Sequence, residues 1–300
     1  YDITVHQLHF SGPAGNDLGL TVDFNTESMS GASPWYVLAD SQNRPVQVMS
    51  GASITEKRDE LAVNLAKYND ATKRAFGVSY STENDYNSLG FNFGSTNWFD
   101  NNNTTVDFGF SYSNDSIRPT QQTGILRINK EDKKSFSVSG GVTRVINRNL
   151  VVGSSASIAH YSGFLSDPYK QAWVERGQVP DSRPDNKDQM ALNLQARQFV
   201  ERFNSALHAD YRFFANSWGT TSHTFRLVWY YNLNEKIQIA PSVRYYNQTA
   251  ANFFRNFYIQ PRGDEYYSSD YRLSAFESMS FKLRTSYIQD WGKIHLSFES

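Results

Sequence analysis

Strict period-two alternation is the feature of this sequence that most restricts its fold. In the segment 188–197, Met190, Leu192 and Leu194 fall on one side of an extended chain, and polar residues fall on the other side. Successive side chains of a β-strand point to opposite faces, so the pattern predicts a strand with one apolar face. The alternation recurs in about fourteen segments of near-transmembrane length, and helical periodicity is nearly absent. The sequence therefore predicts an all-β chain.

The polar faces of these strands carry charges that a dry core would not accommodate. Arg197, Arg212, Arg226 and Arg244 each fall among Gly, Ser, Asn and Gln residues. Burying such groups without partners would cost several kcal/mol each, whereas a watery lumen solvates them. The apolar faces must then point at lipid, and the strands must close, because an open edge in hydrocarbon leaves backbone groups unsatisfied. We therefore predict a transmembrane antiparallel β-barrel that forms one domain over residues 1–300.

Composition supports an aromatic surface rather than a large core. Hydrophobic residues make up 39% of the 300 residues, the mean hydropathy is −0.58, and aromatic residues reach 15%. Low hydropathy argues against a large buried core, and the aromatic content argues against disorder. Aromatic residues near strand ends are expected to form girdles at the membrane interfaces. The candidates are Trp98, Tyr112, Tyr161, Tyr211, Trp229, Tyr231 and Tyr245.

Several classes of function are disfavoured by what the sequence lacks. The net charge is −1 and there is no cysteine, so we expect no nucleic-acid partner, no catalytic thiol and no thiolate metal site. No run of about 18 apolar residues occurs, so no transmembrane helix is predicted. The sequence also has no G-x-S-x-G nucleophile motif. We expect a protein that is not an enzyme and that holds no cofactor.

Short and long connections alternate along the chain, which is typical of outer-membrane barrels with short periplasmic turns. The short series comprises Ser11–Asp17, Asn69–Ala71, Asp100–Asn103, Ile146–Asn149, Val200–Phe203, Asn232–Glu235 and Ser286–Trp291. The other series comprises Met29–Ile54, Asp115–Lys133, Ser162–Asp188 and Thr249–Ser269, together with the brief Thr82–Tyr86 and Ala215–Gly219. This register places both chain ends outside, so we expect one further strand at each end and about sixteen in the complete barrel.

One predicted strand departs from the pattern. Glu277 falls on the apolar face of the segment 269–284, beside Met279 and Phe281. A β-bulge near Ala275 or Phe276 would redirect this carboxylate, and bulges are frequent at barrel rims. We therefore predict a bulge at this position.

The basic residues on the polar faces are the first candidate site. Five of them project from successive predicted strands and would form a lumen-lining wall that favours anions. These residues are Arg197, Arg212, Arg226, Arg244 and Lys282. The alternative is that each pairs with a neighbouring acid such as Asp210. His160, His208, His223 and His295 fall on four separate strands, and we expect them to be lining and rim residues rather than metal ligands.

Two long loops carry aromatic residues that suggest a plug or a partner-docking surface. The first is Gly163–Gly177, with Phe164, Tyr169 and Trp173. The second is Thr249–Tyr258, which we expect to form one or two turns of amphipathic helix that place Phe253, Phe254 and Phe257 together. Packing of these loops on themselves at the outer rim is the alternative.

Several stretches resemble one known family. They are MSGASPWY, GFLSDPYKQAWV, DYRFFANSWGTTSHTFRL, PSVRYYNQTAANFF and SSDYRLS. In this order they resemble an uncharacterised family of Gram-negative outer-membrane β-barrels, domain of unknown function 3570, over nearly the whole chain from about Asp17. The resemblance implies an outer-membrane location and a barrel architecture but no activity. Genes of the family often lie near those of small lipoproteins and periplasmic redox or flavin-attaching proteins, which suggests a role in export or in metal and redox handling.

Two functions fit these features. The first is a porin-like channel or transport component for a small solute in the outer membrane of a Gram-negative bacterium. The second is a plugged structural barrel that acts as a scaffold for a lipoprotein or another subunit of an envelope complex. In both cases the expected partners include the lipids of the outer membrane, and conductance across a bilayer would distinguish the two.

Overall fold

The computed structural model describes residues 2–50, 54–121, 127–289 and 292–299. These residues form one antiparallel sheet of fourteen strands, hydrogen-bonded in the order β1-β2-β5-β6-β7-β8-β9-β10-β13-β14-β15-β16-β17-β18. Its strands are β1 (Asp2–Pro13), β2 (Leu18–Gly31), β5 (Ile54–Asn69), β6 (Thr72–Glu83), β7 (Tyr86–Phe99), β8 (Thr104–Ile117), β9 (Glu131–Asn147), β10 (Leu150–Gly163), β13 (Asn186–Val200), β14 (Ser205–Asn216), β15 (Thr221–Asn232), β16 (Ile237–Gln248), β17 (Phe276–Gln289) and β18 (Gly292–Glu299).

Smaller elements lie in the connections between these strands. Two hairpins pair β3 (Pro34–Ala39) with β4 (Pro45–Met49) and β11 (Gln171–Val174) with β12 (Gly177–Pro180). Two 3₁₀ turns are η1 (Glu201–Phe203) and η2 (Tyr271–Leu273). No helix in the described part of the chain is long and apolar enough to span a membrane.

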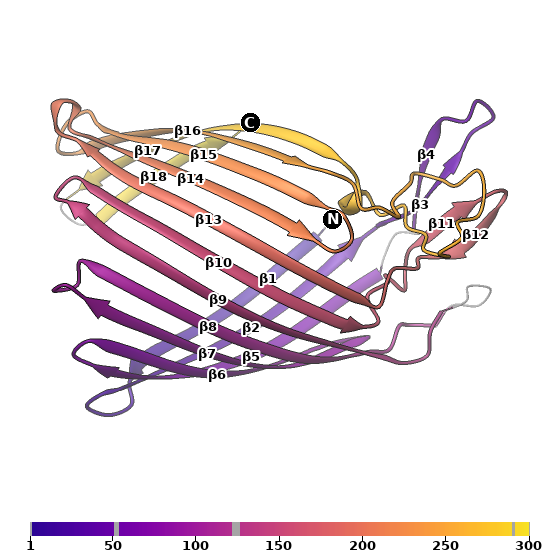
Figure 1. Cartoon of the computed structure of the whole chain (residues 1–300), viewed down its shortest axis with the longest axis horizontal. Coiled ribbons are helices and arrows are strands. Elements are labelled where there is room, and N and C mark those ends of the chain that lie inside the picture. Colours follow the sequence, from indigo (N-terminus) through magenta and orange to yellow (C-terminus); the bar gives the residue numbers. More distant parts are fainter. Residues whose placement is uncertain (1, 51–53, 122–126, 290–291, 300) are drawn as a thin grey trace.

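The sheet curves around a central space, as expected for a barrel. β1, β2 and β5 pass behind β9, β10 and β13, with long strands running obliquely across the body (Figure 1). Each strand of the sheet pairs with the next one along the chain, and the sheet skips only the two hairpins. The prediction of an all-β antiparallel barrel with about fourteen strands in this chain is confirmed.

The cross-strand register gathers the apolar residues onto a single outer face. Leu61 pairs with Phe24 on one side and with Tyr80 on the other, and the same row continues around the sheet. The side chains of this row remain exposed, with Phe225 43% exposed and Leu296 71% exposed. A row of large apolar side chains that no other part of the protein covers is the surface that acyl chains solvate.

Five of the seven proposed girdle residues lie on this outer face. Their strand partners are outer-face residues: Tyr112 pairs with Phe91, and Tyr245 pairs with Phe225. The prediction was wrong for Trp98 and Tyr161, which share the inner-face register. In each case the adjacent residue takes the outward position, because alternation allows only one of two neighbours to face out.

The predicted bulge near Ala275 or Phe276 is also absent. The pairing of β16 with β17 runs from Ile237 opposite Tyr287 to Gln248 opposite Phe276 without a register shift. Glu277 therefore stays on the outer face, where its carboxylate accepts a hydrogen bond from the Tyr245 hydroxyl at 3.2 Å. Glu277 is the second residue of β17, so it lies at the end of the strand, where its carboxylate can reach water. No bulge is therefore needed to redirect it.

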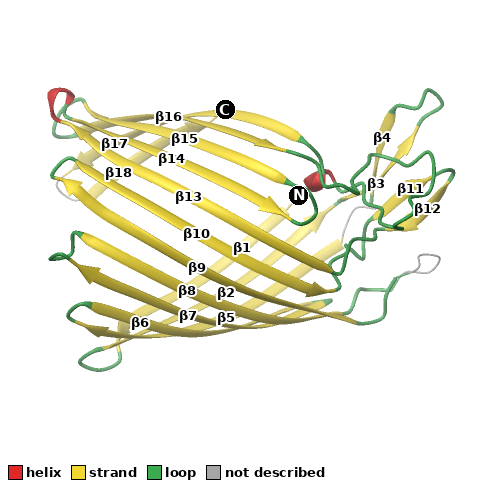
Figure 2. Ribbon diagram, in the orientation of Figure 1, coloured by secondary structure: helices red, strands yellow, loops and turns green. Residues whose placement is uncertain are grey.

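The connections follow the predicted alternation. Short turns gather at one end of the sheet, whereas the longer loops, including both small hairpins, gather at the other end (Figure 2). Parts of three predicted connections, at residues 51–53, 122–126 and 290–291, lie outside the described residues. We call these two ends of the sheet the short-turn end and the long-loop end.

One added charge should affect stability differently on the two faces of β13. Leu194 lies mid-strand on the outer face and is 44% exposed, whereas Gln195 lies on the inner face opposite Asp210. Replacing Leu194 with Lys should lower the free energy of unfolding in lipid vesicles by about 2–4 kcal/mol, because it desolvates an ammonium in hydrocarbon. The matched change Gln195→Lys should have little effect. Equal losses in urea titrations of the two variants would contradict this assignment of the faces.

Candidate functional site

The inner face of β9 and β10, near the middle of the sheet, is a neutral strip. Its residues are small and hydroxylated, and they hydrogen-bond to neighbouring strands: Ser111 contacts Ser137 and Ser113 contacts Ser135, both at 2.8 Å between hydroxyl oxygens. We call this the serine strip, and it comprises Ser135, Ser137, Ser139, Gly141, Gly153, Ser155 and Ser157. These side chains are short, so the strip leaves space on the inner side of the sheet.

All five basic residues singled out in the sequence lie on one side of this strip. Register places Arg197, Arg212, Arg226, Arg244 and Lys282 on the inner face of β13 to β17, and we call them the basic wall. They do not all have the same environment. The Arg197 guanidinium bonds to the Asp210 carboxylate. Pairing with Asp210, the alternative considered for each arginine, therefore holds for Arg197.

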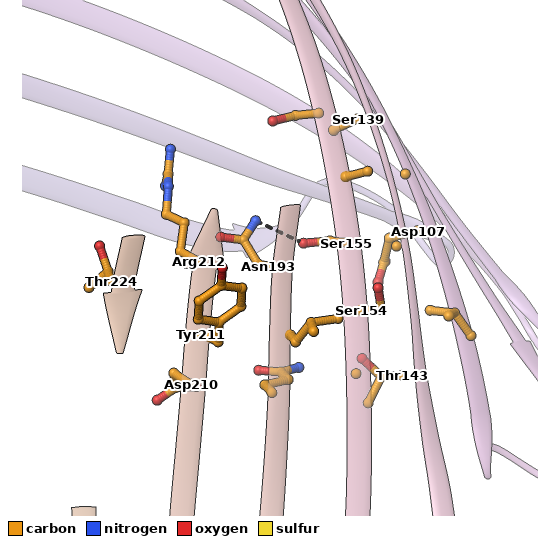
Figure 3. Close-up of a pocket in the computed structure, with 18 of the residues that line it drawn as sticks. Asp107, Ser139, Thr143, Ser154, Ser155, Asn193, Asp210, Tyr211, Arg212 and Thr224 are labelled. Carbon is orange, nitrogen blue, oxygen red and sulfur yellow. Dashed lines mark hydrogen bonds between the residues drawn. The ribbon is translucent and has the colours of Figure 1, made fainter. Parts of the chain in front are cut away.

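A cavity of about 590 Å³ lies against the serine strip and the basic wall. Arg212, Arg226 and Arg244 line it together with Asn193 and Thr224. In Figure 3 the strands that carry Ser155, Asn193, Arg212 and Thr224 run side by side along this cavity, and the Asn193 amide donates to the Ser155 hydroxyl at 3.2 Å. The cavity is therefore walled by hydrogen-bonding groups, by three arginines and by two carboxylates, Asp107 and Asp210.

The other side of the serine strip is acidic, a feature not predicted from the sequence. Seven carboxylates share the inner face of β2, β5, β6 and β8, and we call them the acidic wall. They are Asp23, Glu27, Glu56, Glu60, Glu83, Asp107 and Asp115. The alternation of apolar and polar residues already placed these acids on the inner face, because they occupy the polar positions of their strands.

Basic residues offset only part of the acidic wall. Arg58 lies 2.6 Å from Glu60 and 3.8 Å from Glu83, and Lys133 lies 3.1 Å from Asp115. The remaining acids include Asp107, whose carboxylate accepts a hydrogen bond from the Thr96 hydroxyl at 2.7 Å. The inner face is therefore divided into a net negative block of strands and a net positive block, with the serine strip between them.

At the long-loop end, three connections pack together into a structure that we call the loop cap. It consists of residues 32–50, 164–185 and 249–275. The Trp173 ring stacks on the Tyr36 ring with centroids 6.3 Å apart and planes at 9°. Backbone bridges join Val174 to Tyr258 and Ser182 to Tyr267. Segments more than 100 residues apart in sequence therefore form one unit at this end (Figure 1).

A small apolar cluster anchors the loop cap to the end of the sheet. Phe253 is only 3% exposed and packs edge-on against Trp218, with ring centroids 5.3 Å apart. Phe254 and Leu165 pack against the same cluster. The predicted helix over Thr249–Tyr258 does not form. Backbone bridges tie Tyr258 to Val174 and Phe254 to Ser268, and the local hydrogen bond from the Phe254 N–H to the Ala251 carbonyl closes only a single turn.

The other aromatic residues of the two loops are also engaged. The Tyr169 hydroxyl donates to the Asp85 carboxylate and accepts from the Thr120 backbone N–H at 3.0 Å. Burial and the hydrogen bond to Asp85 raise the pKa of Tyr169 to about 12. Phe257 is half-buried, and the backbone N–H of Phe164 donates to the Asp132 carbonyl at 3.0 Å. These contacts join the first loop to neighbouring connections at the long-loop end, and they do not test a docking role.

Buried charges hold the two long loops of the cap together. Asp270 is 2% exposed and lies 3.0 Å from the Arg183 guanidinium and 2.6 Å from that of Arg272. Arg183 also lies 2.7 Å from Asp181. Burial alone would raise the pKa of Asp270, but the hydrogen bonds and charge of Arg272, Lys170 and Arg183 outweigh it and hold the pKa below its ordinary value. Removing one member would leave its partners charged in a dry site.

The histidines occupy separate positions. His160 and His223 lie on the outer face near the long-loop end, where His160 contacts Asp188 at 2.7 Å and His223 contacts the Tyr211 hydroxyl at 2.7 Å. His208 lies on the inner face against the Tyr230 ring. Over the described ranges, no three His, Asp or Glu side chains are arranged to hold a metal ion.

The fold and its two faces define a β-barrel of the outer-membrane type. A mutant ferric enterobactin receptor of Pseudomonas aeruginosa, solved with enterobactin, matches with a TM-score of 0.61 at 10% identity. The siderophore receptors PirA of Pseudomonas aeruginosa and Acinetobacter baumannii match with TM-scores of 0.56 and 0.57 at 12% and 10% identity. The three matches cover 99% of this chain and 50%, 51% and 49% of those chains, so the chain spans about half their length.

The sequence itself identifies the family. The profile described as "Protein of unknown function (DUF3570)" matches residues 2–300, so the chain belongs to this family. The resemblance found in the sequence is thereby confirmed. None of the curated proteins is significantly similar to the chain in sequence. The likeness to the siderophore receptors is at low identity and shows the barrel fold alone.

Asp270 and Asp264 offer a matched test of the loop cap. Asp270→Ala removes the buried carboxylate that both Arg183 and Arg272 contact, and breaking a buried ion pair costs about 3–5 kcal/mol. Amides in residues 164–185 and 249–275 should then exchange with solvent much faster, whereas those of β5 to β10 should not change. Asp264→Ala breaks an exposed pair with Arg262 in the same loop and should cost less than about 1 kcal/mol. Equal exchange in the two variants would contradict a cap held by Asp270.

Proposed function

We propose that this protein is a channel or transport component for a small solute in the outer membrane of a Gram-negative bacterium. Its outer face presents a continuous apolar row to lipid, and its inner face presents polar and charged residues to the enclosed space. This arrangement suits a water-filled path rather than a packed core. The outer-membrane lipids are its first partners.

The observation that carries this proposal is the state of the inner-face arginines. Arg212, Arg226 and Arg244 are exposed although they point to the inner side of the sheet, and they line a cavity. Guanidinium groups in a sealed apolar interior would require buried acidic partners. Solvated charges along a lumen instead attract counter-ions and polar solutes. We assign the protein to passage or binding of solutes rather than to catalysis.

The loop cap favours a second candidate, a plugged structural barrel. Three connections pack at the long-loop end and are tied by the Asp270 network and by the Trp218 cluster. A cap of this kind would restrict one mouth and present a folded surface to a lipoprotein or another envelope subunit. In this reading the inner charges would pair with a plug or with the partner.

Conductance across a planar bilayer separates the two candidates. Purified protein inserted from detergent should give stepwise currents in KCl, because the inner face offers a continuous hydrated path. Insertion must be checked independently by the resistance of the folded barrel to SDS at room temperature. Correctly inserted protein that carries no current would support the plugged scaffold and would contradict the channel.

Ion selectivity tests whether the basic wall lines that path. The double variant Arg226→Glu and Arg244→Glu changes the charge of the lumen by four units, so the reversal potential in a KCl gradient should shift toward cation preference. Arg144→Glu, on the outer face of β9, changes the charge of the protein outside the lumen and should leave the reversal potential unchanged. An unaltered reversal potential in the double variant would refute a role for these arginines in conduction.

A further inference from the structure

Two arginines face each other directly on the inner side of the sheet. Arg226 of β15 and Arg244 of β16 are cross-strand partners, which places their Cβ atoms about 4.5–5.5 Å apart. Like charges in this position destabilise a sheet. Arg244 lies over the Tyr246 ring at 5.3 Å, and within the described ranges no carboxylate lies within 4.0 Å of either guanidinium. The pair is therefore an unfavourable arrangement for the protein alone.

A third arginine adds to this charge. Arg212 of β14 lies opposite Thr224, the residue two positions before Arg226 on β15, so it is diagonal to the pair. Asp210 lies opposite Arg226 in the register, but its carboxylate is bonded to Arg197. The acid nearest in register to the pair is thus already engaged by a fourth arginine.

The space in front of these arginines can hold a ligand. Arg212, Arg226 and Arg244 line the cavity of about 590 Å³, and all three are exposed to it. Asn193 and Thr224 lie at the same wall and supply neutral hydrogen-bond donors (Figure 3). The serine strip, which also lines the cavity, carries no charge. Two carboxylates line it as well: Asp210 is bonded to Arg197, and Asp107 lies on β8 opposite Gly141, beyond the serine strip from the arginines.

We infer that Arg212, Arg226 and Arg244 form a binding site for a small, multiply charged oxyanion of the phosphate type. A guanidinium presents paired N–H donors that match two oxygens of such a group, and one ligand could accept from both members of the Arg226–Arg244 pair. The ligand would neutralise the repulsion between these two side chains. Because the site is solvated, its affinity should be modest and should fall as ionic strength rises.

This inference rests on the proposed function for the route by which the ligand arrives, and it deepens that function by naming a solute class. Conduction requires sites that bind strongly enough to attract a solute and weakly enough to release it. A solvated arginine site meets this requirement better than a buried one. Arg197 is not included in the site, because its charge is satisfied by Asp210.

Titration with inorganic phosphate at constant ionic strength tests the site directly. Calorimetry of the detergent-purified protein should show saturable binding, and the unfolding temperature should rise with phosphate but not with chloride. Arg226→Gln combined with Arg244→Gln should weaken phosphate binding at least ten-fold. In phosphate-free buffer the same variant should be no less stable than the wild type, since the like-charge contact is removed. The single variant Arg244→Gln provides the same comparison with a smaller change.

The control is Arg144→Gln, which removes one positive charge from the outer face of β9 and should leave phosphate binding unchanged. Phosphate affinity that is unaffected by the double variant, or reduced equally by the control, would overturn the site. Conductance separates this result from the channel proposal. Phosphate binding by a non-conducting barrel would keep the site and reject the channel, whereas conduction without saturable phosphate binding would keep the channel and reject the site.

Discussion

The structure depends on the requirement that every backbone N–H and C=O group in hydrocarbon finds a partner within the protein. In the described residues, fourteen antiparallel strands meet this requirement through ladders with their neighbours, except along the outer edges of β1 and β18. Once the backbone is satisfied in this way, side-chain direction follows from the period of two. The outer positions must be apolar, but nothing in the packing dictates which polar residues occupy the inner ones. The charges on the inner face are therefore informative about function.

Alternation was sufficient to predict the strands and the face of most side chains. Leu194 and Gln195 are neighbours whose opposite directions follow from counting alone, and both directions are confirmed. The predictions were wrong for Trp98 and Tyr161, because both aromatic side chains were assigned to the lipid face although the alternation of their own strands places them on the inner face. For Glu277 the alternation gave the correct outer face, and the error was to assume that a carboxylate cannot face outward at a strand end.

Properties that depend on which strands are neighbours could not be read from separate segments. The opposition of Arg226 and Arg244 follows from the register of β15 with β16, which a single strand does not specify. The acidic wall was overlooked because its residues are spread over four strands and become a block only in the folded sheet. The loop cap is similar, since Trp173 meets Tyr36 across more than 130 residues of sequence. The irregular path of residues 249–258 is set by such contacts rather than by local propensity.

The separation of charge on the inner face connects the sheet order with the proposed transport of a solute. The acidic wall lies on β2 to β8 and the basic wall on β13 to β17, and in Figure 1 β2 and β5 pass behind β10 and β13. Opposite charges held on different sides of one enclosed space produce a field across that space rather than along it. In the proposed channel, such a field would orient a polar solute without greatly changing the free energy of its entry. The arginines around Arg226 and Arg244 would then meet a solute whose anionic group already points toward the basic wall.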